Sequence, residues 1–321
     1  MLEVSVVMSV YNGAEKLGKT IESILHQEGV DFEFIIVNDG STDSSTGILE
    51  KLASCDKRIR VFHQKNTGLT RALIRGCCEA RGDFIARQDV GDISLPGRLE
   101  KELNLMNERN DVAMVSCGTR FVGPEEEFLF NSLHDNPDAT NSLLTLSIDQ
   151  LAGPSSHGST MFRKDLYDKI GGYREEFRRA QDTDLWVRLA EIGRHLVVRE
   201  ILFQTDCSLD GISSGALGKQ KSYDEKIIES AKLRRKDLSD SEILAQVGLI
   251  EAEGIENSSK QIARAAYFIG ACLQKNNNQK AMEYYCKAFS TNPLHLKALC
   301  RYLYCKLRLF NNVVKNGTDR L

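Results

Sequence analysis

The stretch VSVVMSVYN at residues 4–12 decides the fold. Its apolar, β-branched part, residues 4–10, is typical of a buried strand, and Asn12-Gly13 ends that strand with a turn. Similar apolar runs recur further along the chain, at residues 32–37, 58–63 and 84–87. Helical stripes separate these runs; the first carries Leu17, Ile21, Ile24 and Leu25 on one face.

This regular alternation of strands and helices predicts an α/β fold with a mostly parallel central sheet flanked by helices. Ligands of such sheets bind beyond the carboxyl ends of the strands. Polar turns follow three of the predicted strands, at Tyr11-Asn12, at Asn38-Asp39 and at residues 87–92. We therefore expect one binding site to gather these turns.

Composition narrows the class of protein. The 321 residues carry a formal net charge of -3, which argues against nucleic acid as a main partner. The nine cysteines are scattered without a Cys-x-x-Cys pair, as expected in a reducing cytoplasm. The sequence has neither a signal-peptide pattern nor an apolar run long enough to cross a bilayer. We expect a cytoplasmic protein, at most peripheral to the inner face of the membrane.

The sequence changes character after about residue 215, where strand signals give way to charged helical sequence. We place two domains at residues 1–212 and 213–321. Within 260–293, small and aromatic residues at helical spacing resemble one tetratricopeptide-like repeat: Gly270, Ala281, Tyr285, Ala288 and Pro293. A further helix is expected over 294–309, with its buried side formed by Leu296, Leu299, Leu303 and Leu307. A lone helical pair must pack on the N-terminal domain or on a partner chain, and both remain open.

Five segments, in order, carry a resemblance to a known family. They are residues 4–12, IVNDGSTD at 36–43, NTGLTRAL at 66–73, IARQDVGDISLP at 85–96, and GGY at 171–173 leading to AQDTDLW at 180–186. Together they resemble the inverting family-2 glycosyltransferases of bacteria, over roughly the first 205 residues. The resemblance implies a Rossmann-like nucleotide-diphospho-sugar transferase (GT-A) fold. It also implies transfer of a sugar from a UDP-sugar to a hydroxyl acceptor with inversion, in surface polysaccharide or glycoconjugate synthesis.

The resemblance assigns a nucleotide-sugar site to residues of the first four segments: Ser9, Tyr11, Asn12, Asp39, Arg71, Arg87 and Asp89. Asp39 corresponds to the family's uracil-contacting aspartate, and the preference for UDP rests on it. Arg71, one turn into a helix, can reach phosphate oxygens. Each residue also has a purely structural interpretation. Asp39 can cap the following helix, Tyr11-Asn12 can end a strand, and Arg71 can be a solvated arginine.

The metal motif departs from the family. DVGD at residues 89–92 stands where the family usually has Asp-Xaa-Asp-Asp, so the expected ligand of Mn²⁺ or Mg²⁺ is Gly91. Asp92 can take over through a shifted backbone, Asp89 alone can anchor a metal held mostly by phosphates, or the enzyme is slow or inactive. We expect metal at Asp89 and Asp92, weakened by Gly91; both aspartates can also cap the next helix.

Asp182 is the predicted general base, because one carboxylate facing the acceptor hydroxyl suffices for a single displacement. Three further residues are expected to orient or contact the acceptor: Asp184, His157 and Trp186. Their structural alternatives are a helix N-terminus for Asp182 and Asp184, a hydrogen-bonded histidine, and a core tryptophan.

The partners expected are a nucleotide-sugar donor and a glycan or lipid-linked acceptor. A protein partner or a membrane can contact the C-terminal helices, and the basic segment 219–236 is either a solvated helix face or an anionic-membrane contact. A catalytically impaired scaffold is the alternative function, motivated by Gly91. A dinucleotide-dependent oxidoreductase lacks its Gly-x-Gly-x-x-Gly after the first strand.

Overall fold

The computed structural model describes residues 2–209, 217–250 and 258–318. Their contacts divide the chain into two compact units. Unit 1 comprises residues 1–120, 131–205 and 220–252, and unit 2 comprises residues 121–130, 206–219 and 253–321. The predicted boundary between residues 212 and 213 lies outside the described residues and stays a prediction. Most of the helical sequence just beyond it, residues 220–252, belongs to unit 1 rather than to a separate C-terminal region.

Nine strands of the described residues form one sheet in the order β3-β2-β1-β4-β8-β6-β9-β5, and β7 pairs with β6. They are β1 Val4–Val10, β2 Phe32–Asp39, β3 Ile59–Gln64, β4 Phe84–Arg87, β5 Ile93–Ser94, β6 Val112–Val122, β7 Phe128–Ser132, β8 Thr160–Arg163 and β9 Arg194–Asp206. Strands β1 to β4 pair in parallel, as predicted, whereas β8 pairs antiparallel with β4 and β6.

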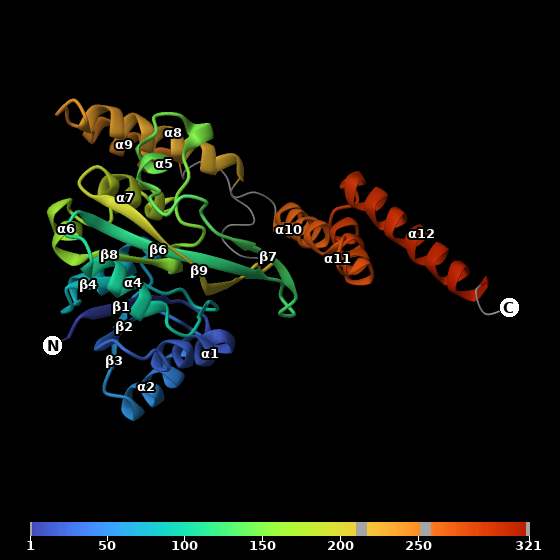
Figure 1. Ribbon diagram of the computed structural model, residues 1–321, viewed down its shortest axis with the longest axis horizontal. Helices are drawn as coiled ribbons and strands as arrows, with labels where there is room; N and C mark the ends of the chain where they lie inside the picture. The colour runs from blue at the N-terminus through green and yellow to red at the C-terminus, as the bar shows by residue number, and fades with distance from the viewer. Residues whose placement is uncertain (1, 210–216, 251–257, 319–321) are drawn as a thin grey trace. The chain divides into compact units, whose positions relative to one another are not determined.

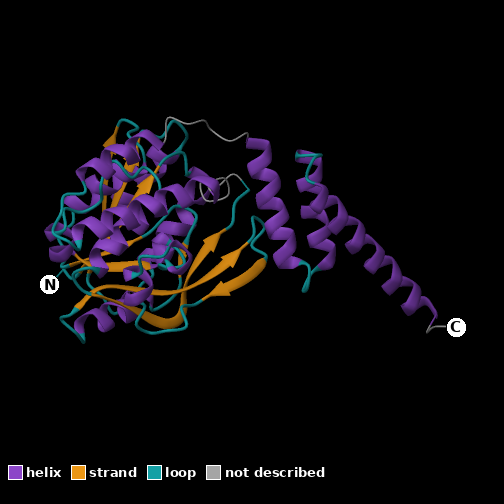
Figure 2. Cartoon of the chain, turned by 90° about the horizontal axis from the view of Figure 1, so that it is seen from above, coloured by secondary structure: helices purple, strands orange, loops and turns teal. Residues whose placement is uncertain are grey.

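Helices cover both faces of this sheet in unit 1 (Figures 1 and 2). One face carries α1 Ala14–Leu25, α2 Ser45–Cys55 and α4 Arg98–Asn107. The other carries α3 Leu69–Cys78, α6 Lys164–Lys169, α7 Gln181–Ala190, α8 Leu217–Arg234 and α9 Ser241–Ile250, and α5 spans Thr140–Leu144. Because side chains alternate along a strand, Val6 and Met8 of β1 pack on the first face and Val7 on the second. The predicted fold class is confirmed.

Unit 2 joins three helices to the hairpin segment 121–130. They are α10 Ser258–Leu273, α11 Asn278–Thr291 and α12 Leu296–Thr318. A Cβ at Gly270 would lie 3.0 Å from Cδ1 of Tyr285, so α10 and α11 approach as closely as the predicted repeat requires. The pair packs on the hairpin, where Tyr284 Oη donates to Glu127 Oε1 at 2.8 Å and Phe130 lies edge-on to Phe268.

The predicted burial of the α12 leucines is wrong for three of them. Leu296, Leu303 and Leu307 are 65%, 48% and 63% exposed. The side of α12 that faces α11 carries smaller residues instead, Ala298 and Cys305, both fully buried. Small side chains let two helices approach closely, so the leucines are left on the outer face. No helix of the described residues is long and apolar enough to span a membrane.

Candidate active site

Arg87 is the last residue of β4, and its side chain is fully buried. Its Nη2 donates to Asp89 Oδ1 at 2.6 Å, and Nη1 donates to the carbonyl oxygens of Val7 and Gln88. A buried guanidinium needs such partners, because it is otherwise costly to remove from water. Burial alone would lower the pKa of Arg87, but the charge of Asp89 raises it above its ordinary value. Arg87 is therefore a fixed positive charge at the carboxyl end of β4.

His157 lies against this arginine from a distant part of the chain. It opens a 3₁₀ turn, His157–Ser159, directly before β8, and the antiparallel pairing of β8 with β4 brings the turn to Arg87. His157 Nε2 accepts from Arg87 Nε at 3.3 Å and lies 2.7 Å from Tyr173 Oη. Burial keeps the pKa of the Tyr173 phenol well above its usual range, so its hydroxyl stays protonated and can donate. Two donors on Nε2 imply a neutral ring with its proton on Nδ1.

Asp182 stands at the start of α7, the helix whose Trp186 packs against the same histidine. Its Oδ1 accepts the Thr183 N–H at 2.8 Å. Ala180, two residues before Asp182, has a φ of 53°, a left-handed conformation that is strained for a residue with a side chain. Such strain is typical of functional segments, and here it sets the direction in which α7 starts.

Several charged groups act on the pKa of the His157 ring. Removal from water and then the charge of Arg87 lower the pKa of His157 to about 4. The negative charges of Asp89 and Asp182 act in the opposite direction on the same pKa. Both carboxylates therefore lie close enough to influence one ring, although they are separated by almost a hundred residues of sequence. Hydrogen bonds join Arg87 to Asp89 and to His157, and Asp182 lies in the first turn of the helix that packs on this histidine through Trp186.

Asp39 is the last residue of β2, and its side chain binds the loop that precedes α3. Its Oδ1 accepts the Thr67 N–H at 2.9 Å and Gln64 Nε2 at 2.7 Å, and its Oδ2 accepts the Gly68 N–H at 2.9 Å. The residue is 2% exposed. Asp39 thus fixes the loop that precedes α3. Its structural interpretation, that it caps the following helix α2, is wrong, because α2 has no side-chain cap. Each carboxylate oxygen can accept more than one hydrogen bond, so this arrangement leaves capacity at Oδ2 for a further donor.

The loops after β1 and β2 are tied to one another. Asn12 Oδ1 accepts the Thr42 N–H at 2.8 Å, and the Asn12 N–H donates to Ser41 Oγ at 3.0 Å. Tyr11 is 54% exposed beside this junction, and Ser9 is partly buried on β1. Ser9, Tyr11, Asn12 and Asp39 therefore lie along one rim, which is formed by the carboxyl ends of the neighbouring strands β1 and β2.

Arg71 lies in the first turn of α3, next to the loop that Asp39 holds. It is about half exposed and forms an ion pair of 3.0 Å with Glu175, which is also exposed. Thr70 Oγ1 donates to the carbonyl of Phe177 at 2.8 Å. These contacts connect the Asp39 side of the rim with the segment that leads into Asp182.

Asp184 and Trp186 face the interior. Asp184 Oδ2 accepts from Nε and Nη2 of Arg188 at 3.0 and 2.6 Å, and both side chains are almost fully buried. This carboxylate therefore positions α7 and is turned away from an acceptor, which corrects its predicted role. Trp186 is 4% exposed and packs edge-on to His157, with ring centroids 6.1 Å apart. The core interpretation of Trp186 holds, and an acceptor-stacking surface does not.

The predicted metal ligands are held differently from one another. Asp92 is buried, and its Oδ1 accepts from Thr205 Oγ1 at 2.7 Å. Asp89 is about 30% exposed and shares Oδ1 with Arg87. No group of three or more potential ligands occurs within the described ranges. The donor set fits Mg²⁺ or Mn²⁺ bound mainly through substrate phosphates and one or two carboxylates, and does not fit a metal caged by protein.

Residues 5–171 match the family described as Glycosyl transferase family 2. That is slightly more than half of the chain. The chain belongs to this family and is a glycosyltransferase.

Individual relatives agree with the family. The putative glycosyltransferase EpsE of Bacillus subtilis is 33% identical over 207 residues, covering 63% of this chain and 72% of that protein. The O-antigen biosynthesis glycosyltransferase WbnJ of Escherichia coli is 32% identical, over 58% of this chain and 71% of that one. The crystal structure of S. aureus TarS 1-349 in complex with UDP-GlcNAc has a TM-score of 0.59 at 16% identity, covering 97% and 92% of the two chains. This last likeness concerns the fold.

Sequence reasoning missed one layer of the glycosyltransferase site, the buried support of residues 87–92. Arg98 is fully buried at the start of α4 and donates to Ser94 Oγ at 2.8 Å and to the carbonyl of Arg87 at 2.9 Å. An ion pair with Glu102, which is also fully buried, fixes the Arg98 side chain in place. Burial raises the pKa of Glu102, against the charge of Arg98. An arginine four residues before a glutamate is the only signal in the sequence, and it is common on exposed helices.

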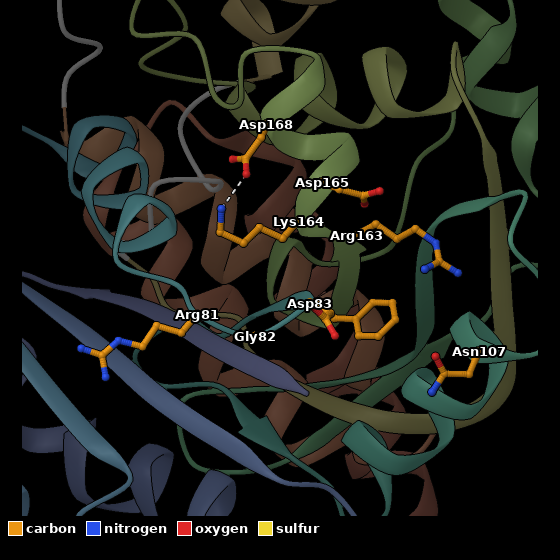
Figure 3. Close-up of a pocket in the computed structure, with 9 residues that line it drawn as sticks. Arg81, Gly82, Asp83, Asn107, Arg163, Lys164, Asp165 and Asp168 are labelled. Carbon is orange, nitrogen blue, oxygen red and sulfur yellow. Dashed lines mark hydrogen bonds and ion pairs between the residues drawn. The ribbon is translucent and has the colours of Figure 1, made fainter. Parts of the chain in front are cut away.

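A separate pocket of about 510 Å³ lies at the other end of β4 (Figure 3). It is lined by Arg81, Gly82, Asp83, Phe84, Asn107, Arg163, Lys164, Asp165 and Asp168. Arg163 donates there to the carbonyls of Val112 and Met106, and Lys164 pairs with Asp168 at 2.5 Å. The pocket contains none of the candidate site residues.

Proposed function

We propose that this glycosyltransferase transfers a sugar from a UDP-sugar to a hydroxyl acceptor with inversion, in the synthesis of a surface polysaccharide or glycoconjugate. The observation that supports the proposal is geometric: Arg87 binds both Asp89 and His157 at the end of β4. His157 in turn packs against Trp186 of α7, the helix whose first turn contains Asp182. The relatives support the reaction: one is named for O-antigen biosynthesis, and the TarS structure holds UDP-GlcNAc within the same fold.

Asp182 acts as the general base in this proposal. It is partly exposed at the rim, where an acceptor hydroxyl can approach it. The carboxylate removes the hydroxyl proton as the acceptor oxygen attacks the anomeric carbon, and the nucleoside diphosphate leaves from the opposite face. A single displacement of this kind inverts the configuration. No second carboxylate has to act, because the diphosphate leaves without an acid; a glycoside hydrolase, in contrast, needs two.

The nucleotide occupies the rim formed by the loops after β1 and β2. Tyr11 offers an exposed ring against the base, and Asn12 and Ser9 lie at the same strand end. Asp39 Oδ2 accepts the base N–H, and Arg71 exchanges its exposed partner Glu175 for phosphate oxygens, since an exposed ion pair contributes little. Arg87 holds Asp89 in place beside the diphosphate.

Asp89, together with the diphosphate, would hold Mn²⁺ or Mg²⁺, which would supply Lewis-acid stabilisation of the leaving group. The contact of Asp92 with Thr205 favours Asp89 over Asp92 as the principal ligand. Gly91 offers no carboxylate, so we expect a weaker affinity for metal than in family members with Asp-Xaa-Asp-Asp. We further propose a cytoplasmic location, with a nucleotide sugar as the donor and a glycan or lipid-linked molecule as the acceptor.

The test is release of UDP from a panel of nucleotide sugars with Mn²⁺, Mg²⁺ or a chelator present. Asp182→Asn should lower transfer by about 10²- to 10⁴-fold while leaving UDP binding intact, because general-base catalysis contributes that much. Asp165→Asn, an exposed aspartate in the separate pocket, is the matched control and should keep full activity. Full turnover by the Asp182 variant would contradict the assignment of the base.

A second function, a scaffold without catalysis, is motivated by Gly91 alone. Calorimetry with UDP separates the two. A transferase should bind UDP more tightly in the presence of Mn²⁺, and a scaffold should show no metal-dependent binding.

A further inference from the structure

Over residues 296–308, the part of α12 whose side chains the structure describes, the helix has two apolar faces, and only one of them is covered. Ala298 and Cys305 pack against α11, with Tyr302 partly buried between them. The opposite face carries exposed residues at spacings of four, three and four, which keep them on one line of the helix: Leu296, Cys300, Leu303 and Leu307. Leu296, Leu303 and Leu307 are 65%, 48% and 63% exposed on this one face, and they form a surface that folding of unit 2 leaves in water.

The charges of α12 are all of one sign. Between Leu296 and Thr318 the sequence has five basic residues and no aspartate or glutamate. Lys297, Arg301 and Arg308 are exposed and fall on one flank of the leucine face, at spacings of four and seven. Lys306 is exposed on the other flank, and Tyr304, 52% exposed, lies at the border between apolar and charged residues. The leucine face is thus bordered by positive charge on both sides.

This pattern selects among the surfaces that could cover the leucines. A second copy of α12 would bring five positive charges against five, with no acidic residue in either helix to pair with them. An anionic lipid surface complements both features, since leucines enter the acyl boundary while lysines and arginines meet the headgroups. The tyrosine at the border is the residue type that membrane interfaces favour.

We propose that the outer face of α12 is a membrane-surface contact that binds anionic lipid bilayers. Helix α12 lies in the plane of the interface, with Leu296, Leu303 and Leu307 in the apolar layer. The inference concerns a surface outside the candidate active site and does not depend on which sugar is transferred. It also relocates the membrane contact considered for residues 219–236. In that segment α8 buries Tyr223 and Ile227 in unit 1, and Arg234 is paired with Glu191 and Asp240.

Co-sedimentation of the full chain with vesicles tests the proposal without any turnover. Vesicles of phosphatidylcholine containing about 30% phosphatidylglycerol should bind the protein, and pure phosphatidylcholine should bind it far more weakly, because the surface charge attracts basic residues. Each lost charge should weaken partitioning about fivefold, so the triple variant Lys297→Gln, Arg301→Gln, Arg308→Gln should lose about 100-fold. The control removes three exposed lysines of unit 1, Lys51, Lys57 and Lys169, and should bind normally.

The leucines are tested in the same assay. Leu303→Gln with Leu307→Gln should reduce binding about tenfold or more, since both side chains leave the apolar layer. Leu249→Gln, at a position 70% exposed on α9, is the matched control. Circular dichroism checks that each variant is folded, and UDP release from the nucleotide sugar should be unchanged.

Equal binding to anionic and neutral vesicles, or no binding to either, would overturn the proposal. Sedimentation velocity adds a second way to refute it. A concentration-dependent dimer that disappears in the Leu303, Leu307 variant would show that a second copy covers this face, and an acidic peptide that blocks it without lipid would favour a protein partner. Loss of transfer with intact vesicle binding would concern the proposed function alone.

Discussion

Oδ2 of Asp184 lies 2.6 Å from Nη2 of Arg188, one turn along α7, and neither side chain is more than 2% exposed. Asp182 stands two residues earlier on the same helix, which places it on the opposite side, at the rim. The sequence QDTD at 181–184 thus holds two carboxylates with different tasks. One is available to a substrate, and the other neutralises a buried arginine.

Two matched substitutions separate these tasks. Asp184→Asn should lower the free energy of unfolding by about 3 kcal/mol, because it leaves the buried charge of Arg188 without its counter-ion. Below the melting transition its turnover per folded molecule should stay within a few-fold of the wild type. Asp182→Asn should show the reverse, a normal unfolding curve with lost turnover. Urea unfolding and a transfer assay on the same preparations provide the measurement, and identical behaviour of the two variants would contradict the division.

Arg87→Lys should weaken both the fold and the donor site. A lysine keeps the charge but cannot donate hydrogen bonds to Val7, Asp89 and His157 together, because it lacks the planar N–H groups of a guanidinium. We expect a loss of about 2 kcal/mol in the free energy of unfolding, less than for a fully buried pair since Asp89 is partly exposed. The KM for nucleotide sugar should rise.

The control for Arg87 is Arg58→Lys. Arg58 pairs with Asp56 on the surface, where both side chains are partly exposed. An exposed pair contributes up to about 1 kcal/mol, so this variant should unfold almost like the wild type. If both arginine variants lose equal stability, the special position of Arg87 is not supported.

The sequence predicts the first half of the sheet closely because its signals are local. The apolar run at 4–10 is strand β1 to the residue, and the run at 84–87 is β4. The contact between Arg87 and His157, in contrast, cannot be predicted from local sequence. It requires β8 to insert between β4 and β6, a pairing between segments 70 residues apart that no local pattern reports.

Periodicity also leaves α12 ambiguous. The leucines at 296, 299, 303 and 307 and the set formed by Ala298, Tyr302 and Cys305 both recur at helical spacing. Hydrophobicity favours the leucines as the buried set, whereas close packing on α11 favours the smaller residues. The distance between α11 and α12 decides which set is buried, and that distance follows from the tertiary structure. Asp39 is similar, because its partners Thr67 and Gly68 belong to a loop after the next strand.

Acid should destabilise unit 1 through His195 before it protonates the carboxylates. His195 is fully buried in β9, with Nε2 2.8 Å from Ser116 Oγ. Burial, followed by the charge of His134, lowers the pKa of His195 to about 3. The unfolded chain takes up this proton near pH 6.5, so the stability is fully present above that pH and falls as the pH drops towards 3.

Urea unfolding at about pH 7, 6 and 5 measures the effect, with a slope of up to about 1.4 kcal/mol per pH unit from one histidine. His195→Gln should flatten the dependence by that amount. His63→Gln removes an exposed ring and should leave the slope unchanged. A slope that survives in the His195 variant would assign the acid sensitivity to other groups.

Gly91 stands where a metal-binding carboxylate is expected, and the structure sharpens the test of introducing one there. Gly91 has a φ of 97°, and a Cβ there would lie 3.0 Å from Cδ of Lys16. Any side chain at this position should therefore cost about 1–2 kcal/mol of stability, and Gly91→Asp cannot be compared with the wild type alone. Gly91→Ala carries the same backbone strain without the carboxylate and is the required reference.

Relative to Gly91→Ala, we expect Gly91→Asp to need about tenfold less Mn²⁺ for half-maximal transfer, the effect of about 1.4 kcal/mol from one added carboxylate ligand. A titration of Mn²⁺ at fixed nucleotide sugar measures this ratio. Equal Mn²⁺ requirements in the two variants would mean that a carboxylate at position 91 does not reach the metal, since Lys16 occupies the space beside it. Asp89 would then remain the principal ligand on the protein side, and the glycine would be an adaptation of the loop to Lys16.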